Sequence, residues 1–360
     1  MGKRKTVAIL FGGKSVEHKI SLRSAKNIYD NIDKDNFNIV LIGISQDGQW
    51  YYLEDYTFNI EEGEPIALKL TQRGDIFYTW KDGKSIGNID IFFPVLHGND
   101  GEDGSVQGLL RTLNIPLVGT GVLGSAVVFD KVCSKRLLTD AGIPNAKFLS
   151  YSLEEKELID FHYVRQNLGL PFFVKPSASG SSVGVSKVED EKTFTQAIND
   201  TFQYDNVVLI EEFIKGREIE CSVKGNINPD VSQPGEIHVA GSYNFYSFDA
   251  KYVDDSGAEL DMPANLPEET RVKIQEMAIN AYKALYCEDF ARVDMFLKEN
   301  GEILVNEINS IPGFTHISMF PQLWKLDGIS YTELITELID TAFKKHNRQN
   351  RIKRDFESAL

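Results

Sequence analysis

The sequence predicts an α/β protein built from three consecutive domains. In the first third of the chain, short and wholly apolar segments alternate with segments of helical spacing, which is the pattern of a parallel sheet covered by helices on both faces. The middle third combines strand-like segments with short helices, and the last third is rich in strands. The length of 360 residues also exceeds what one hydrophobic core usually fills.

The first domain is predicted to cover residues 1–119. We expect its strands and helices where the apolar residues run continuously or recur every three to four positions. The strands are expected at 6–11, 37–44 and 89–95, and the helices at 21–32 and 105–113. Ligands of such sheets bind beyond the carboxyl ends of the strands, so the loops that follow the first and third strands are candidate binding loops.

The second domain is predicted over 120–213 and the third over 214–360. In the second domain, a loop of small polar residues joins two strands that form a hairpin. Its predicted elements are a helix at 127–141, strands at 172–175, 183–188 and 207–213, and a helix at 193–200. The elements predicted for the third domain are strands at 218–224, 238–244, 292–297 and 303–309 and helices at 268–286 and 334–346.

The composition excludes several classes of function. Lys and Arg number 38 against 53 Asp and Glu, and the net charge of −15 disfavours a nucleic-acid or anionic-membrane partner. The longest charge-free stretch, near 115–129, is shorter than the ~20 apolar residues of a membrane span. Cys133, Cys221 and Cys287 form no CxxC pair, so we expect no disulfide framework and a reducing, cytoplasmic compartment.

Two glycine motifs suggest nucleotide-binding signatures that their context does not support. Residues 11–15 read F-G-G-K-S, but Ala8 stands where a Walker A loop needs its first glycine. Residues 119–124 match G-x-G-x-x-G, and Asp140 follows Gly119 by 21 positions. Because Asp140 falls late in a predicted helix and not at a strand end, a nicotinamide site is disfavoured and a tight turn is the simpler interpretation.

The strongest site prediction comes from two polar pairs on neighbouring strands. Period-two alternation puts Arg292 and Asp294 on one face of their strand. The same alternation puts Glu307 and Asn309 on one face of the next strand, and Gly301 lies in the turn between them. Carboxylate and amide oxygens suit Mg²⁺ better than Zn²⁺, and an arginine beside them suits a phosphate or an oxyanion. A salt-bridged pair of edge strands is the alternative.

Three further segments carry candidate binding groups. Lys175 ends a strand just before the loop of small polar residues, where a lysine and backbone N–H groups can bind phosphate. Segment 211–214 can offer backbone hydrogen bonds to a base edge, and Glu218 can hold a ribose. Loop 96–104 and Glu17 follow strands of the first domain, and Glu17 can hold an ammonium group. The alternatives are a flexible surface hairpin for Lys175 and its loop, an acidic linker for 211–218, and ordinary turns for the loops of the first domain.

Six stretches together resemble the D-alanine–D-alanine ligases of the ATP-grasp superfamily. They occur in family order and span nearly the whole chain. They are F-G-G-K-S-V-E-H-K-I-S-L-R-S-A (11–25), L-H-G-N-D-G-E-D-G-S-V-Q-G (96–108), G-V-L-G-S-A-V-V-F-D-K (121–131), V-K-P-S-A-S-G-S-S-V-G-V-S (174–186), F-Y-S-F-D-A-K-Y (245–252) and A-R-V-D-M-F-L with N-E-I-N-S-I-P-G-F-T (291–315). The resemblance implies an ATP-grasp architecture with a Rossmann-like N-terminal domain and a lid loop at 242–260.

The resemblance also implies how ATP is bound, between the second and third domains. The implied phosphate contacts are Lys131, Lys175 and Lys251, and the groups around adenine and ribose are Glu211, Phe213, Ile214 and Glu218. Ser182 and Phe245 are further implied ATP contacts. The implied metal ligands are Asp294, Glu307 and Asn309, which hold two Mg²⁺ ions or Mn²⁺ in their place.

The same resemblance implies two amino-acid subsites. The implied groups are Glu17, Ser181 and Tyr252 for the first ammonium, His97 near the first carboxylate, Ser310 and Ser318 for the second carboxylate, and Arg292 with the Gly313 backbone for the oxyanion. The lid reads Y-S-F-D at 246–249, where Y-D-Y-E is commoner, and Tyr252 favours an amine acceptor over a hydroxy acid.

The activity that the resemblance implies is the ligation of two D-alanines through an acyl phosphate, with release of ADP and phosphate, for peptidoglycan precursor synthesis. A homodimer through the first domain is implied as well. A D-Ala–D-Ser ligase, another ATP-grasp carboxylate–amine ligase and a nucleotide-binding regulator without catalysis are the alternatives. Retention of Arg292, Asp294, Glu307 and Asn309 counts against the regulator.

Overall fold

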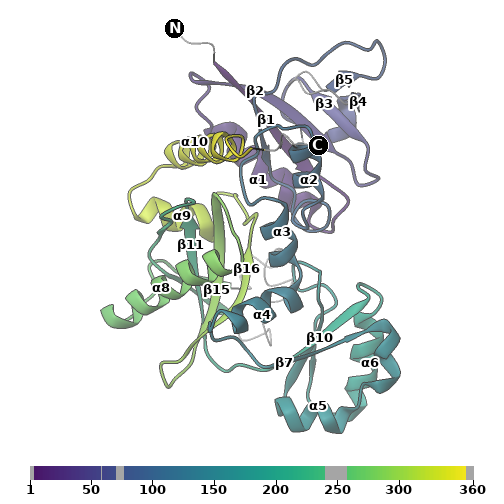
Figure 1. Cartoon of the computed structure of the whole chain (residues 1–360), viewed down its shortest axis with the longest axis vertical. Coiled ribbons are helices and arrows are strands. Elements are labelled where there is room, and N and C mark those ends of the chain that lie inside the picture. Colours follow the sequence, from purple (N-terminus) through teal and green to yellow (C-terminus); the bar gives the residue numbers. More distant parts are fainter. Residues whose placement is uncertain (1–3, 58, 70–76, 240–257, 354–360) are drawn as a thin grey trace, which may run out of the picture.

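The computed structural model describes residues 4–57, 59–69, 77–239 and 258–353, and they form three sheets with their helices (Figure 1). The sheets follow one another along the chain, which confirms the predicted α/β class. The first sheet lies at one end of the molecule and the second at the other (Figure 1). No described helix is both long and apolar enough to cross a membrane.

The first sheet is mixed and has six strands in the order β5-β4-β3-β2-β1-β6. Its parallel part is the predicted one and consists of β1 (Lys5–Gly12), β2 (Phe37–Ile44) and β6 (Ile91–Pro94). The antiparallel part is β3 (Trp50–Leu53), β4 (Glu64–Leu68) and β5 (Phe77–Thr79). These short strands were not predicted, because their half-exposed residues give no long apolar run.

Strand β1 is buried on both faces, as its continuous apolar sequence predicts. Val7, Ile9 and Phe11 face one core, whereas Ala8 and Leu10 face another. The first core also contains α1 (His18–Asn31), α9 (Met319–Leu326) and α10 (Tyr331–Gln349), and the second contains α2 (Ser105–Thr112). Helix α10, from the end of the described chain, therefore packs on the first sheet.

The second sheet has the order β7-β10-β8-β9 and is antiparallel. Its elements are β7 (Phe148–Ser152), β8 (Phe172–Pro176), β9 (Ser186–Val188), β10 (Val207–Glu212), the 3-10 helix η2 (Leu153–Leu158), α5 (Phe161–Leu168) and α6 (Glu191–Thr201). The predicted strand at 183–188 is wrong over its first half. Ser181, Ser182 and Gly184 have φ between 52° and 72°, so the chain turns there and pairs only from Ser186.

The predicted single helix at 127–141 is also wrong, since the chain forms α3 (Val122–Phe129) and α4 (Lys131–Asp140). Asp130 is extended between them and caps α4, accepting a hydrogen bond from the Cys133 N–H. Both helices pack against the third sheet through residues such as Val128 and Leu138. The boundary after residue 119 stays a prediction, as does the one after 213.

The third sheet has the order β14-β13-β11-β15-β16, with β12 paired to β11. Its elements are β11 (Arg217–Lys224), β12 (Asp230–Val231), β13 (Gly235–Val239), β14 (Ala258–Asp261), β15 (Phe290–Leu297), β16 (Ile303–Asn309) and α8 (Glu268–Ala284). Most of the predicted lid, 242–260, and the end of the predicted strand at 238–244 lie outside the described residues.

Strands β15 and β16 form the predicted antiparallel hairpin, with Gly301 at φ +84° in the turn. Asp294 pairs with Glu307 and Met295 with Val305, so Asn306 is an extra residue in β16. This bulge shifts the alternation by one position. Val305 can therefore face the core along with Met295, while Glu307 stays on the face that carries Asp294.

Candidate active site

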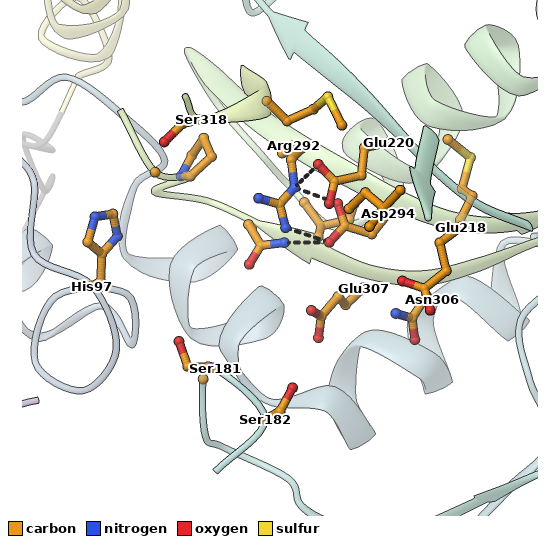
Figure 2. A pocket seen from close by; sticks show the side chains of 18 of the residues that line it. His97, Ser181, Ser182, Glu218, Glu220, Arg292, Asp294, Asn306, Glu307 and Ser318 are labelled. Carbon is orange, nitrogen blue, oxygen red and sulfur yellow. Dashed lines mark hydrogen bonds and ion pairs between the residues drawn. The ribbon is translucent and has the colours of Figure 1, made fainter. Parts of the chain in front are cut away.

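A cavity of about 1070 Å³ lies where strands of the second and third sheets meet α1 and the loop after β6 (Figure 2). It is lined by every predicted site residue that the structure describes. These are Glu17, His97, Lys131, Lys175, Ser181, Ser182, Glu211, Phe213, Ile214, Glu218, Arg292, Asp294, Glu307, Asn309, Ser310, Gly313 and Ser318. The remaining predicted residues, Phe245, Lys251 and Tyr252, lie outside the described residues.

Arg292 holds the centre of one wall of the cavity (Figure 2). Its Nε and one terminal nitrogen each donate to Asp294 at 2.7 Å, which is a bidentate pair. Its Nε also lies 3.0 Å from Glu220 Oε2 on the neighbouring strand β11. Asn309 Nδ2 donates to Asp294 Oδ2 at 3.0 Å. The guanidinium is therefore fixed in its orientation by carboxylates from two strands.

Glu17 stands at the amino end of α1, and its carboxylate is buried against the loop of small polar residues. The Ser181 hydroxyl donates a hydrogen bond to Glu17 Oε1. A Cβ on Gly180 would lie 2.7 Å from Glu17 Oε2, so a side chain at this position would displace the Glu17 carboxylate. A residue of the first domain thus meets the small-residue loop of the second.

Lys135, Lys175 and Glu211 form a buried group that we call the cavity floor, of which Lys175 and Glu211 line the cavity. Lys175 Nζ donates to Glu211 Oε1 at 3.0 Å, and Lys135 Nζ forms an ion pair with Glu211 Oε2. Burial acts to raise the pKa of Glu211, but the two ammonium groups outweigh it and hold that pKa below its ordinary value. The two cations and one anion leave one positive charge, and Lys175 lines the cavity.

Lys131 is the first residue of α4, and its side chain reaches the loop of small polar residues that contains Ser179. Its Nζ donates to the Ser179 carbonyl at 2.6 Å and lies 3.9 Å from Glu307 Oε2. It stands one helical turn before Lys135, so both amines lie on one face of α4. Cationic groups on α4 and β8 thus flank a loop with backbone N–H groups, an arrangement suited to phosphate.

Phe213 lines the cavity and is 38% exposed, and the centre of its ring lies 6.1 Å from that of the Phe173 ring. Lys187 Nζ lies 5.5 Å from the centre of the Phe213 ring. Ile214 and Glu218 line the cavity beside it. An apolar surface next to backbone at a strand end and a carboxylate suits a planar base with an attached sugar.

His97 and Glu102 belong to the loop after β6 and differ in their partners. Burial is the main cause that lowers the pKa of His97, and the Arg292 charge acts in the same direction. The Glu17 charge and the hydrogen bond to the Ile311 carbonyl act to raise that pKa, but they are outweighed. Glu102 accepts from the Gly98 N–H at 2.7 Å. Burial and the nearby Glu17 charge raise the pKa of Glu102 to about 8.

The loop after β16 provides Ser310, Gly313 and Ser318. Ser310 is fully buried, and its hydroxyl has no hydrogen-bond partner among the described residues although the residue lines the cavity. Such a group is satisfied when a ligand bonds to it. The Ser318 hydroxyl accepts from the Thr315 N–H at 3.0 Å.

Sequence reasoning missed Glu220, Lys135 and Glu102. Glu220 alternates with buried Ile219 and Cys221 on β11, which is a signal as good as that of Asp294. Lys135 follows Lys131 by four positions on a helix, so the spacing alone could have placed them on one face. Glu102 has no signal beyond its place in a turn-rich loop.

Comparisons with known proteins show the family of this chain. The family model described as the D-ala D-ala ligase N-terminus matches residues 6–120, and that of the D-ala D-ala ligase C-terminus matches residues 137–340. The chain belongs to the D-alanine–D-alanine ligase family. The D-alanine–D-alanine ligase of Oceanobacillus iheyensis is 49% identical over 361 residues, covering 97% of this chain and 98% of that protein.

Solved structures of the family have the same fold. The D-alanine–D-alanine ligase of Coxiella burnetii superposes with a TM-score of 0.86 at 34% identity, covering 97% of both chains. The VanG D-Ala:D-Ser ligase of Enterococcus faecalis superposes with a TM-score of 0.85 at 35% identity, covering 94% of this chain and all of the other. The chain is thus an ATP-dependent ligase that acts on small molecules, as predicted.

Proposed function

We propose that this chain joins two D-alanine molecules to D-alanyl-D-alanine, with conversion of ATP to ADP and phosphate, for peptidoglycan precursor synthesis. The observation that supports this most is one cavity that unites a buried carboxylate for an ammonium, lysines for phosphates and a fixed guanidinium for an oxyanion. The relative from Oceanobacillus iheyensis, itself named a D-alanine–D-alanine ligase, matches along 97% of this chain.

In this proposal ATP lies along the cavity between the second and third sheets. Its base packs on Phe213 beside the backbone of Ile214, and its ribose bonds to Glu218. Its phosphates lie between Lys131, Lys175 and the loop at Ser182. Lys251 and Phe245 of the lid stay predicted contacts.

The residues that would hold Mg²⁺ are Asp294, Glu307 and Asn309. Asp294 and Glu307 are a cross-strand pair and line the cavity, and their oxygens are hard ligands that suit this ion. The ion would neutralise charge on the phosphates. Two ions, with Mn²⁺ as a substitute, are proposed from the family resemblance alone.

The first step is attack of the first D-alanine carboxylate on the γ-phosphoryl group. This substrate places its ammonium at Glu17, supported by Ser181 and by Tyr252 of the lid, with His97 near its carboxylate. A bond forms between a carboxylate oxygen and the γ-phosphorus as the bond from that phosphorus to the ADP oxygen breaks. The product is an acyl phosphate. Positioning and charge neutralisation by Lys175 and Arg292 supply the catalysis.

The second step is attack of the second D-alanine amine on the acyl carbon, with phosphate as the leaving group. The carboxylate of this substrate bonds to the unpartnered hydroxyl of Ser310 and to Ser318. Arg292 and the Gly313 N–H stabilise the tetrahedral oxyanion.

D-Serine is the second candidate acceptor. The D-Ala:D-Ser ligase of Enterococcus faecalis matches this chain as well in TM-score and identity as the D-alanine–D-alanine ligase of Coxiella burnetii does. Acceptor choice depends on small differences in pocket shape, which overall similarity does not report.

A cytoplasmic, homodimeric enzyme is also proposed. The three cysteines are free thiols, which is consistent with a reducing compartment. The proposal of a dimer through the first domain rests on the family resemblance. Light scattering during size-exclusion chromatography tests it by measuring the molar mass in solution.

The function is tested by ADP release with Mg·ATP and D-alanine, L-alanine, D-lactate or D-serine, with mass identification of each product. We expect ADP and D-alanyl-D-alanine from D-alanine alone. A preference for D-alanine with D-serine would show that D-serine, and not D-alanine, is the acceptor. ADP release that does not depend on any amino acid would contradict the proposed ligase activity.

A further inference from the structure

Two backbone groups of Ile311, just before Pro312 and Gly313, are held by side chains of the first domain. The Ile311 N–H donates to Glu102 Oε1 at 3.3 Å. The Ile311 carbonyl accepts from His97 Nδ1 at 3.0 Å. Both side chains belong to the loop after β6, about 210 residues earlier in the sequence. The chain is therefore fixed from outside its own domain on one side of Gly313.

Phe314, just after Gly313, is held in the same way. Its N–H donates to Ser24 Oγ at 3.1 Å, and its carbonyl accepts from Asn27 Nδ2 at 2.7 Å. Ser24 and Asn27 both lie on α1. All four backbone polar groups of the two residues flanking Pro312–Gly313 thus bond to side chains of the first domain.

These hydrogen bonds form one connected chain. His97 Nε2 lies 3.3 Å from Ser24 Oγ. Burial lowers the pKa of His97, which favours the neutral form of the ring. The proton is assigned to Nδ1, which faces a carbonyl, so Nε2 accepts from the Ser24 hydroxyl. The Ser24 oxygen in turn accepts the Phe314 N–H.

The side chain of Phe314 anchors the same segment. It is 1% exposed and belongs to the core that α1, β1 and α10 share. Its ring lies 6.2 Å from that of Phe93 and 5.7 Å from that of Phe320. Because the Phe314 side chain is packed in a core and both of its backbone polar groups are hydrogen-bonded, the position of this part of the loop is fixed.

Gly313 lies between these anchors and lines the cavity. No described residue accepts a hydrogen bond from its N–H. Glycine has no side chain, so the backbone N–H is the donor that this residue can offer a ligand, and a Cβ at this position would approach Ser318 Oγ to 2.9 Å. An oxyanion donor is effective only when its position is fixed before the reaction.

We propose that Ser24 and Asn27, together with His97 and Glu102, are positioning residues that hold the Gly313 N–H at the oxyanion. This rests on the proposed function. The consequence is that the domain that binds the first substrate also sets the geometry of the second step. Acyl phosphate formation does not need this N–H, so loss of the anchors slows amine attack selectively.

The test compares Ser24→Ala and Asn27→Ala with the unaltered enzyme by counting dipeptide formed per ADP released. We expect dipeptide formation to fall ~10-fold, less than the loss of an oxyanion donor costs, with an unchanged KM for ATP. The ratio of dipeptide to ADP should fall below one, because a longer-lived acyl phosphate is lost to water. Ser232→Ala is the matched control, since its buried hydroxyl accepts the Ser222 N–H at 3.0 Å outside the cavity lining.

A ratio of one in both variants, or a KM for ATP that rises in step with the fall in kcat, would overturn the proposal. Ser24 is fully buried, and if Ser24→Ala does not fold, the half-buried Asn27 decides. Failure of the unaltered enzyme to make dipeptide would instead contradict the proposed function.

Discussion

At the scale of single residues, Arg292 is the group whose removal should affect the reaction most. Arg292→Ala is expected to lower kcat ~10²-fold, because the tetrahedral oxyanion of the second step loses the guanidinium that stabilises it. The KM for ATP should change little, since the lysines remain. Steady-state kinetics measure both quantities. Arg271→Ala is the control, because Arg271 pairs with the exposed Glu268 on α8. A near-normal kcat would exclude Arg292 from the chemistry.

Glu102 should make the stability of the protein depend on pH. Its pKa is raised from 4.5 to about 8 by burial and by Glu17. Between these pH values the folded protein binds a proton that the unfolded chain has released, so this group's contribution to the free energy of unfolding falls as pH rises. We expect Glu102→Gln to gain stability relative to the unaltered protein from pH 5 to pH 8, measured by urea unfolding. A difference that is constant with pH would contradict this.

The sequence predicts a site residue when the period of its own strand or helix places it, and it does not predict the distant residues that contact it. Arg292 and Asp294 alternate with buried neighbours, so their shared face follows from the strand period. Glu220 and Lys135 contact their partners across strands and between helix and sheet. Strand and helix periods indicate the face on which Glu220 and Lys135 lie, but no local pattern identifies their partners, which are far apart in the sequence.

At the scale of elements, α4 supports the cavity floor through Lys135. Lys135→Met should lower the free energy of unfolding by about 3 kcal/mol, the low end for a broken buried ion pair, because Glu211 keeps Lys175. The KM for ATP should also rise, since the floor loses its surplus positive charge. Lys192→Met, on the exposed face of α6, is the control. An unchanged stability and KM would show that the charge of Lys135 is not needed.

The sequence predicted most elements and missed those decided by tertiary contacts. The continuous apolar run of β1 and the alternation of β15 are strong local signals. The break between α3 and α4 depends on the cap at Asp130, and apolar periodicity does not show it. The bulge at Asn306 likewise appears only in the pairing with β15.

At the scale of the whole molecule, α10 joins the last part of the chain to the first sheet. Lys345 Nζ donates to Asp289 Oδ2 at 2.6 Å and to the Gly119 carbonyl, and both charged groups are buried. Lys345→Met should cost about 3–5 kcal/mol of unfolding free energy, because it leaves a buried charge unpaired. Thermal unfolding measures this.

The KM for ATP should be unchanged in the folded Lys345→Met variant, since neither Lys345 nor Asp289 lines the cavity. A loss below about 1 kcal/mol would mean that water replaces the lysine. The sequence indicated three sheets, but the return of α10 to the first sheet could not be predicted, because its apolar face fits any core.

The central claim is that one cavity activates a D-alanine carboxylate as an acyl phosphate and passes it to a second amine. The most direct test uses D-alanine labelled with ¹⁸O in its carboxylate and follows the label by mass spectrometry. The claim predicts one labelled oxygen in the released phosphate for each D-alanyl-D-alanine formed. Unlabelled phosphate alongside dipeptide would contradict it, because the carboxylate oxygen would then never have bonded to phosphorus.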